Sequence, residues 1–347
     1  MSDYFNPQFF IAATSESSSD SDPPSAPSFE PSTPVSTPSA ALPPFVHAGQ
    51  PMINISSTFN LHATLRPTPP DTVIASADQV FFFVHFHTLL APSYNFFGGL
   101  LPPGLHPTDV KPFTFVVPEP ADVLNVILHC LYELPCDAYS PSLDCIDAAI
   151  TAQTQYGLDP HHYLARGMPL YETVLLHAPR SPIETYALAA AHKCEDLAVA
   201  ASAYTLPVPL HCVSHDIVDR IGTRYMHRLL RLHISRMDTL KDLLDAPLYP
   251  HVAKPHCSAE QRRVVGRAFQ LAGAQVYYSA TPALARSGIE TIMNSLVEAI
   301  GCHDCRESLE AHVKKLVTQW ILTQVRLTMM TAPRWDHAPM LLLQCTI

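Results

Sequence analysis

The order of the secondary-structure signals limits what this chain can fold into more than any other feature of its sequence. Three runs with strand character stand at residues 72–76, 80–85 and 113–117, and Ala77-Asp78 forms a turn between the first two. After Val117 the apolar residues recur only with helical spacing. Strands followed by helices are typical of an α+β fold and not of the alternating order of a parallel-sheet enzyme. We therefore predict a three-stranded sheet with helices, followed by an all-α C-terminal region.

The helical signals can be placed more closely. Breaks at Gly98-Gly99, at 118–120, at 207–209 and at 247–255 separate the helical stretches. In chain order, the predicted helices are 87–97, a helix opened by Pro118-Glu119-Pro120 and ending near Leu134, 142–156, 163–176, two short helices within 182–204, one around 217–232, 259–278, 282–300 and a last helix carrying Leu309 to Ile321.

Residues 1–70 differ in composition from the rest. Proline and serine are concentrated there, and Arg66 is its only lysine or arginine. Such a segment buries too little apolar surface to offset its chain entropy. We predict a disordered tail over 1–70, a first domain over 71–206, a helical region over 207–330 and a short tail over 331–347.

The net charge and the cysteine content indicate which kinds of partner and which cellular compartment to expect for this chain. The net charge of −10 disfavours nucleic acid as a partner. Nine scattered cysteines, no basic leader at the N-terminus and no long apolar run indicate a soluble chain with reduced thiols. We expect it in the cytoplasm or nucleus and expect no membrane partner.

The stretch 71–134 resembles the BTB/POZ family. The family signature is an Asp, a hairpin, a Val-His pair, a Leu, a Ser and a Phe at set spacing, followed by a third strand and a helix. The matching positions here are Asp71, Val84-His85, Leu89, Ser93 and Phe96. Further on, 148–158, 184–197, 220–244 and 302–320 resemble the helical extension of fungal, basidiomycete BTB proteins.

The resemblance implies a protein-interaction module without catalysis, acting through unidentified protein partners or weak homodimers. The expected interaction surface comprises Asp71, His85, Tyr94, Phe96 and Phe97, although in this family the histidine at position 85 is structural. Phe86 replaces a usual basic residue, and the Pro-rich segment before Asp71 lacks the strand that many such dimers exchange. The alternative is a substrate adaptor of a cullin-type ubiquitin ligase, but 104–110 lacks the glutamate of such adaptors.

Catalytic and phosphate-binding signatures are missing from the sequence. It contains no GxGxxG, GxxxxGK, GxSxG or HExxH pattern. The aromatic run Phe81-Phe82-Phe83 is better explained by a buried strand than by a ligand site. We therefore expect no enzymatic activity.

One short motif points to metal chemistry. Cys302 and Cys305 form a CxxC pair at a predicted helix start, and two thiolates at this spacing can bind one zinc ion. Cys257 with His256 or His312 could complete four ligands. The alternative is a pair of ordinary reduced cysteines, since there is no second CxxC and no thioredoxin-like context. No other cofactor is expected.

Overall fold

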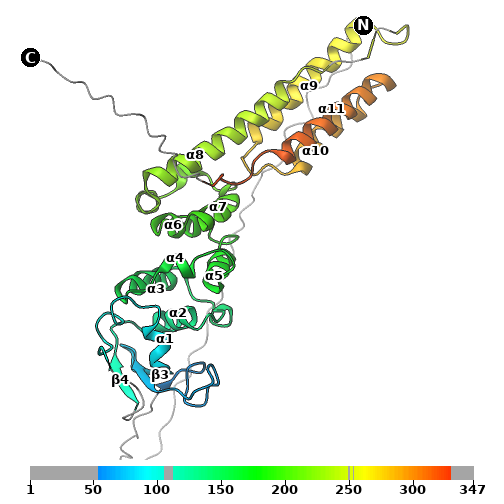
Figure 1. The fold of residues 1–347 in the computed structure, drawn as a ribbon. Coiled ribbons are helices and arrows are strands. Elements are labelled where there is room, and N and C mark those ends of the chain that lie inside the picture. Colours follow the sequence, from blue (N-terminus) through cyan, green and yellow to red (C-terminus); the bar gives the residue numbers. More distant parts are fainter. Residues whose placement is uncertain (1–53, 105–111, 249–250, 253, 330–347) are drawn as a thin grey trace, which may run out of the picture. The chain divides into compact units, whose positions relative to one another are not determined.

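The computed structural model describes residues 54–104, 112–248, 251–252 and 254–329 (Figure 1). Its strands form one mixed sheet in the order β1-β3-β2-β4. β2 (Thr72–Ala75) and β3 (Val80–Val84) make the antiparallel hairpin predicted from the sequence, and β4 (Phe113–Val116) pairs with β2 in parallel. The α+β class and the largely helical C-terminal region are confirmed.

The structured part of the chain begins earlier than the sequence suggested. A short strand, β1 (Asn54–Ile55), pairs in parallel with β3, so the sheet has four strands instead of three. Phe59 is fully buried, and its backbone carbonyl accepts a hydrogen bond from Phe83. The predicted disordered tail is therefore wrong for residues 54–70, because one large aromatic side chain anchors this proline-containing segment. Residues 1–53 of that tail lie outside the described residues.

The helices agree with the predicted pattern in most places. Their bounds are α1 (Phe86–Leu90), α2 (Ala121–Leu131), α3 (Leu143–Gln155), α4 (Pro160–Tyr163), α5 (Pro169–His177), α6 (Pro182–Ala191), α7 (Glu195–Ser202), α8 (His215–Asp245), α9 (Ala259–Ser279), α10 (Arg286–Glu298) and α11 (His303–Leu322). Gly222 interrupts the helical backbone of α8 with φ +74°. Within the described residues, no helix is both long and apolar enough to span a bilayer.

Two helix predictions need correction. The helix expected over 87–97 ends at Leu90, because Pro92 cannot donate a backbone hydrogen bond and the chain then turns. The helix expected over 163–176 begins only at Pro169, in α5. Tyr163 is the last residue of α4, and Gly167 at φ +88° lies in the turn between the two helices.

A first hydrophobic core packs the sheet against α1 to α7 and the N-terminal half of α8. Tyr186 of α6 is fully buried there, and its hydroxyl donates to the carbonyl of Tyr225 on α8 at 2.9 Å. Leu229 and Leu232 are the last α8 residues in this core. The expected boundary at 206/207 therefore does not separate two cores, since the beginning of α8 belongs to the first.

A second core lies among the C-terminal part of α8 and α9, α10 and α11. Leu240 and Leu244 of α8 meet Phe269 of α9, Met293 of α10 and Trp320 of α11. These four helices contact one another as a bundle (Figure 1). One helix, α8, thus contributes to both cores.

The chain after α11 returns to the first core. Leu327 is buried there, and its backbone N–H donates to Ser202 Oγ at 2.9 Å. Arg236, only 4% exposed, donates to the carbonyls of Pro282, Thr323 and Gln324 and lies over the Trp320 ring. This arginine therefore joins α8, the segment before α10 and the chain that follows α11.

Candidate interaction turn and metal-ligating cluster

Two signature residues of the sequence analysis, Asp71 and His85, hold the start of α1. The Asp71 carboxylate accepts from the backbone N–H of Phe86 at 2.7 Å. His85 Nε2 lies 2.8 Å from the Thr68 carbonyl and must donate to it, which leaves Nδ1 to accept from the Tyr132 hydroxyl at 2.7 Å. His85 is only 5% exposed. Both residues therefore have structural roles, and His85 is not available as a surface contact.

The turn after α1 is fixed onto the C-terminal end of α3. Ser93 Oγ donates to the Tyr156 carbonyl at 2.7 Å, and Asn95 Nδ2 donates to the Gln155 carbonyl at 2.9 Å. The Tyr94 backbone N–H donates to the carbonyl of Gly157 at 3.0 Å. Three hydrogen bonds from three consecutive residues therefore leave this turn little freedom.

Gly157 allows this close approach. It has φ +69°, and a Cβ built on it would lie 2.3 Å from Asn95 Oδ1. Phe96 and Phe97 also adopt positive φ, 58° and 54°, a conformation that costs free energy for bulky residues. The surrounding hydrogen bonds hold the turn in this strained form.

The three aromatic residues predicted as contacts separate into two groups. Tyr94 is 78% exposed and Phe96 is 44% exposed. Phe97 is fully buried and stacks on the Tyr156 ring with the centroids 4.2 Å apart. The prediction that Phe97 lies on the interaction surface is therefore wrong, because the strained turn directs it into the core. We call Tyr94 and Phe96 the aromatic turn.

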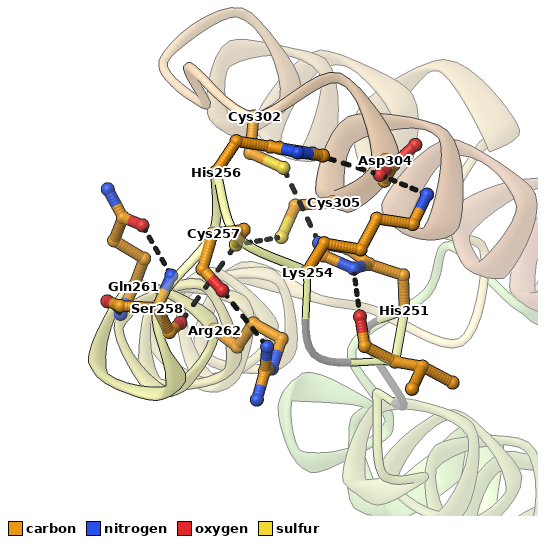
Figure 2. A network of polar contacts seen from close by, with 11 residues as sticks. His251, Lys254, His256, Cys257, Ser258, Gln261, Arg262, Cys302, Asp304 and Cys305 are labelled. Carbon is orange, nitrogen blue, oxygen red and sulfur yellow. Dashed lines mark hydrogen bonds and ion pairs between the residues drawn. The ribbon is translucent and has the colours of Figure 1, made fainter.

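The predicted cysteines come together in the second core, with a histidine that the sequence analysis did not choose. Cys257 Sγ lies 3.6 Å from Cys305 Sγ, and Cys302 Sγ lies 3.4 Å from His251 Nε2 (Figure 2). All four candidate ligand atoms lie within 4.8 Å of one another. We call these four residues the Cys/His cluster.

Local structure explains why these side chains meet. A backbone bridge between Lys254 and Cys257 makes a tight turn that directs the Cys257 thiol inward, where it is 1% exposed. Cys302 is the N-cap of α11, so Cys305 lies in its first turn. Asp304 in the same turn accepts from Lys254 at 2.5 Å, which attaches the α8–α9 segment to α11.

Neither predicted fourth ligand holds that position. His256 lies with its Nε2 3.2 Å from Asp304 Oδ2 and has a 60% exposed side chain (Figure 2). It approaches Cys302 in a group with Asp304, but that group contains no other sulfur. The His312 ring packs edge-on against Phe269 at 5.0 Å. His251 takes the place instead, and the signal that could have indicated it is its position in the same proline-broken segment as Cys257.

Electrostatics differ between the two thiols of the CxxC pair. The backbone hydrogen bond from Cys305 lowers the pKa of Cys302 to about 6, assisted by contacts with Cys257 and His251. Burial raises the pKa of Cys305 to about 12, and the neighbouring thiols Cys257 and Cys302 add to this. A helix N-terminus favours a thiolate in the same way.

Two kinds of chemistry fit such an arrangement. A thiolate beside an imidazole can act as a nucleophile. Four soft ligands converging on one point can hold a metal ion. A nucleophile does not require Cys257 and Cys305, which are buried with their sulfurs in contact, whereas a metal site requires both. The complete cluster therefore favours metal binding.

We compared the chain with known protein families, curated proteins and solved structures. No family model matches the chain, and neither a curated protein nor a solved structure matches it.

Proposed function

We propose that this chain is a non-catalytic protein–protein interaction module of the cytoplasm or nucleus, built on a BTB/POZ-like core. What supports the BTB/POZ-like assignment is the order hairpin, helix, strand, helix over β2, β3, α1, β4 and α2, which is the order that the sequence resemblance implied. The residues at the signature positions also have structural roles in this part of the fold. Asp71 and His85 fix α1, Leu89 is fully buried, and Ser93 anchors the following turn.

The observation that carries the proposal is the aromatic turn. Exposed aromatic side chains supply large contact area, and a contact surface that is rigid before binding loses little entropy on association. Tyr94 and Phe96 are exposed while Ser93, the Tyr94 backbone and Asn95 are hydrogen-bonded to residues 155–157. Strained backbone at Phe96 is a further feature of functional positions.

Self-association of the full chain gives the first test. Sedimentation velocity over a wide concentration range should show a monomer–dimer equilibrium that the double variant Tyr94→Ala/Phe96→Ala weakens by about 30-fold or more, the size of a hot-spot effect. The matched control is Tyr278→Ala, since Tyr278 is 95% exposed on α9. A strictly monomeric chain at the highest concentration would exclude a homotypic surface.

Affinity capture with the same variants tests partners other than the chain itself. A direct partner should be lost with the double variant and retained with Tyr278→Ala. Recovery of a cullin would favour the adaptor alternative, whose diagnostic segment, 104–110, lies outside the described residues apart from Gly104. Equal capture by both variants would rule out the aromatic turn as the contact surface.

A further inference from the structure

We propose that His251, Cys257, Cys302 and Cys305 form a structural zinc site that joins the segment between α8 and α9 to the start of α11. This inference does not depend on the proposed interaction function. It concerns the second core, whereas the aromatic turn belongs to the first.

The donor set suits zinc. Three thiolates and one imidazole are among the usual ligand sets of structural zinc sites, and soft sulfur donors disfavour magnesium and calcium. Four protein ligands fill a tetrahedron, so none of its positions is left for water or substrate. The site is therefore structural and not catalytic.

The distances agree with tetrahedral coordination. Zinc–sulfur bonds of about 2.3 Å require sulfur atoms about 3.8 Å apart, and a sulfur–nitrogen edge of about 3.5 Å follows with a zinc–nitrogen bond near 2.0 Å. The Cys257–Cys305 sulfurs lie 3.6 Å apart, and Cys302 Sγ lies 3.4 Å from His251 Nε2. The other four ligand–ligand distances are within 4.8 Å, so all four side chains converge on one point.

The imidazole of His251 has the orientation that a metal ligand needs. Its Nδ1 lies 2.6 Å from the carbonyl of Val252 and must donate to it (Figure 2). A neutral ring then carries its lone pair on Nε2, the atom directed at Cys302. Histidines that bind metals commonly donate their other N–H to a carbonyl in this way.

The four ligands come from two places that are far apart in the sequence. Cys257 lies immediately before α9, and Cys302 immediately before α11, so α9 and α10 lie between the two ligand pairs. Arg262 also donates to the Cys257 carbonyl at 3.1 Å, and Arg306 donates to the Ile300 carbonyl at 2.8 Å, which holds the backbone on both sides. Zinc at this point would close the loop formed by α9 and α10.

Metal content and coordination of the full chain, purified under reducing conditions without chelator, provide the first experiment. We expect equimolar zinc by elemental mass spectrometry. X-ray absorption should give three sulfurs at about 2.3 Å and one nitrogen at about 2.0 Å. A reduced, folded chain that stays free of zinc after incubation with zinc would overturn the proposal, as would a Cys257–Cys305 disulfide in the freshly purified chain.

Two pairs of variants assign the ligands. His251→Ala should weaken zinc affinity more than about 100-fold, because even outer-shell changes cost about 10- to 100-fold. His256→Ala should stay close to wild type. Cys302→Ser should lose zinc, while Cys212→Ser, at an exposed free cysteine, should retain it. Affinities come from competition with a chromophoric chelator, and circular dichroism checks folding.

The comparison between the two histidines keeps the assignment falsifiable even if a cysteine variant unfolds. If His256→Ala lost zinc and His251→Ala kept it, the proposed ligand set would be wrong. Zinc binding unchanged in both His251→Ala and Cys302→Ser would also refute it. Selective alkylation of Cys302 in a zinc-loaded chain would indicate a free Cys–His pair instead of a ligand.

Discussion

The two hydrophobic cores of this chain are stabilised by different means. The first core contains the sheet, whose backbone groups pair with one another, and large aromatic side chains such as Tyr186 and Phe59. The second core has helices alone and many fewer buried apolar residues among the described ones. It contains the Cys/His cluster. The Arg236 side chain lies over the Trp320 ring of this core and donates a hydrogen bond to the Pro282 carbonyl.

The difference has a physical cause. A small core buries too little apolar surface to offset the entropy lost on folding, and small domains commonly add metal ions or other cross-links. If the Cys/His cluster binds zinc, metal binding and the hydrogen bonds of Arg236 would supply part of the stability that apolar packing supplies in the first core. The contrast therefore predicts that the second core depends on a few polar contacts and that the first does not.

Removal of zinc should have the largest effect. If the cluster binds zinc, its binding free energy is part of the folding free energy of the second core, on the order of 10 kcal/mol in isolated zinc peptides. Hydrogen exchange with mass spectrometry should show faster exchange in α9, α10 and α11 after chelation. Exchange in β2, β3 and α2 should stay the same. Faster exchange in both regions would contradict two separately stabilised cores.

Substitution of Arg236 should have the second-largest effect on stability. Arg236→Met keeps much of the side-chain volume but leaves the carbonyls of Pro282, Thr323 and Gln324 without this donor. Pro282 and Thr323 are only partly buried and Gln324 is exposed, so water can replace part of the lost hydrogen bonding. With the loss of the contact to the Trp320 ring, we expect a decrease of about 2–3 kcal/mol in the free energy of unfolding. Urea denaturation measures it.

The matched control for Arg236 lies on the same helix. Arg231→Met removes the same charge at an exposed position and should change stability by less than about 0.5 kcal/mol. Similar losses in both variants would mean that net charge, and not the buried hydrogen bonds, explains the effect.

A glycine in the first core provides the next test. Gly157→Ala adds a Cβ at φ +69° and against Asn95, whereas Gly167→Ala adds one at φ +88° with no atom within 4 Å. The unfavourable φ alone costs about 1 kcal/mol, and the collision at Gly157 should at least double that loss. Thermal unfolding compares the two variants. Equal losses of stability in the two variants would show that the aromatic turn can move to accommodate the added carbon atom and is not rigid.

The smallest expected effect is a pH dependence at the junction of the cores. Burial, with a contribution from Arg236, lowers the pKa of His233 to about 4. As pH falls below about 6.5, the unfolded chain binds a proton that the folded chain does not, so stability is lost between about pH 6.5 and pH 4. Between pH 7.5 and 5.5 the loss should be about 1 kcal/mol.

The variant His233→Leu isolates this contribution from those of other histidines, since burial also lowers the pKa of His129 and His312. Its free energy of unfolding, measured by denaturant at both pH values, should fall less than that of the wild type. An identical fall in both proteins would assign the pH dependence elsewhere.

The sequence by itself determined the elements whose signals are local. The hairpin of β2 and β3, the strand β4 and most helices follow from apolar periodicity and from proline and glycine breaks, which act within a few residues. The CxxC pair could be chosen for the same reason, because its ligand type and short spacing are visible in the sequence. Cys257, far upstream, could be chosen from its ligand type alone.

Only the tertiary structure decided which distant groups meet. The strand β1 and the burial of Phe59 depend on pairing with the edge of β3. The inward orientation of Phe97 depends on the close approach of Asn95 to Gly157, where a Cβ would collide. His251 and His256 lie in one segment and have the same chemistry, so spacing could not distinguish them. The His256 ring contacts the Asp304 carboxylate, whereas the His251 ring contacts the Cys302 sulfur, and such orientations are set by contacts between distant segments.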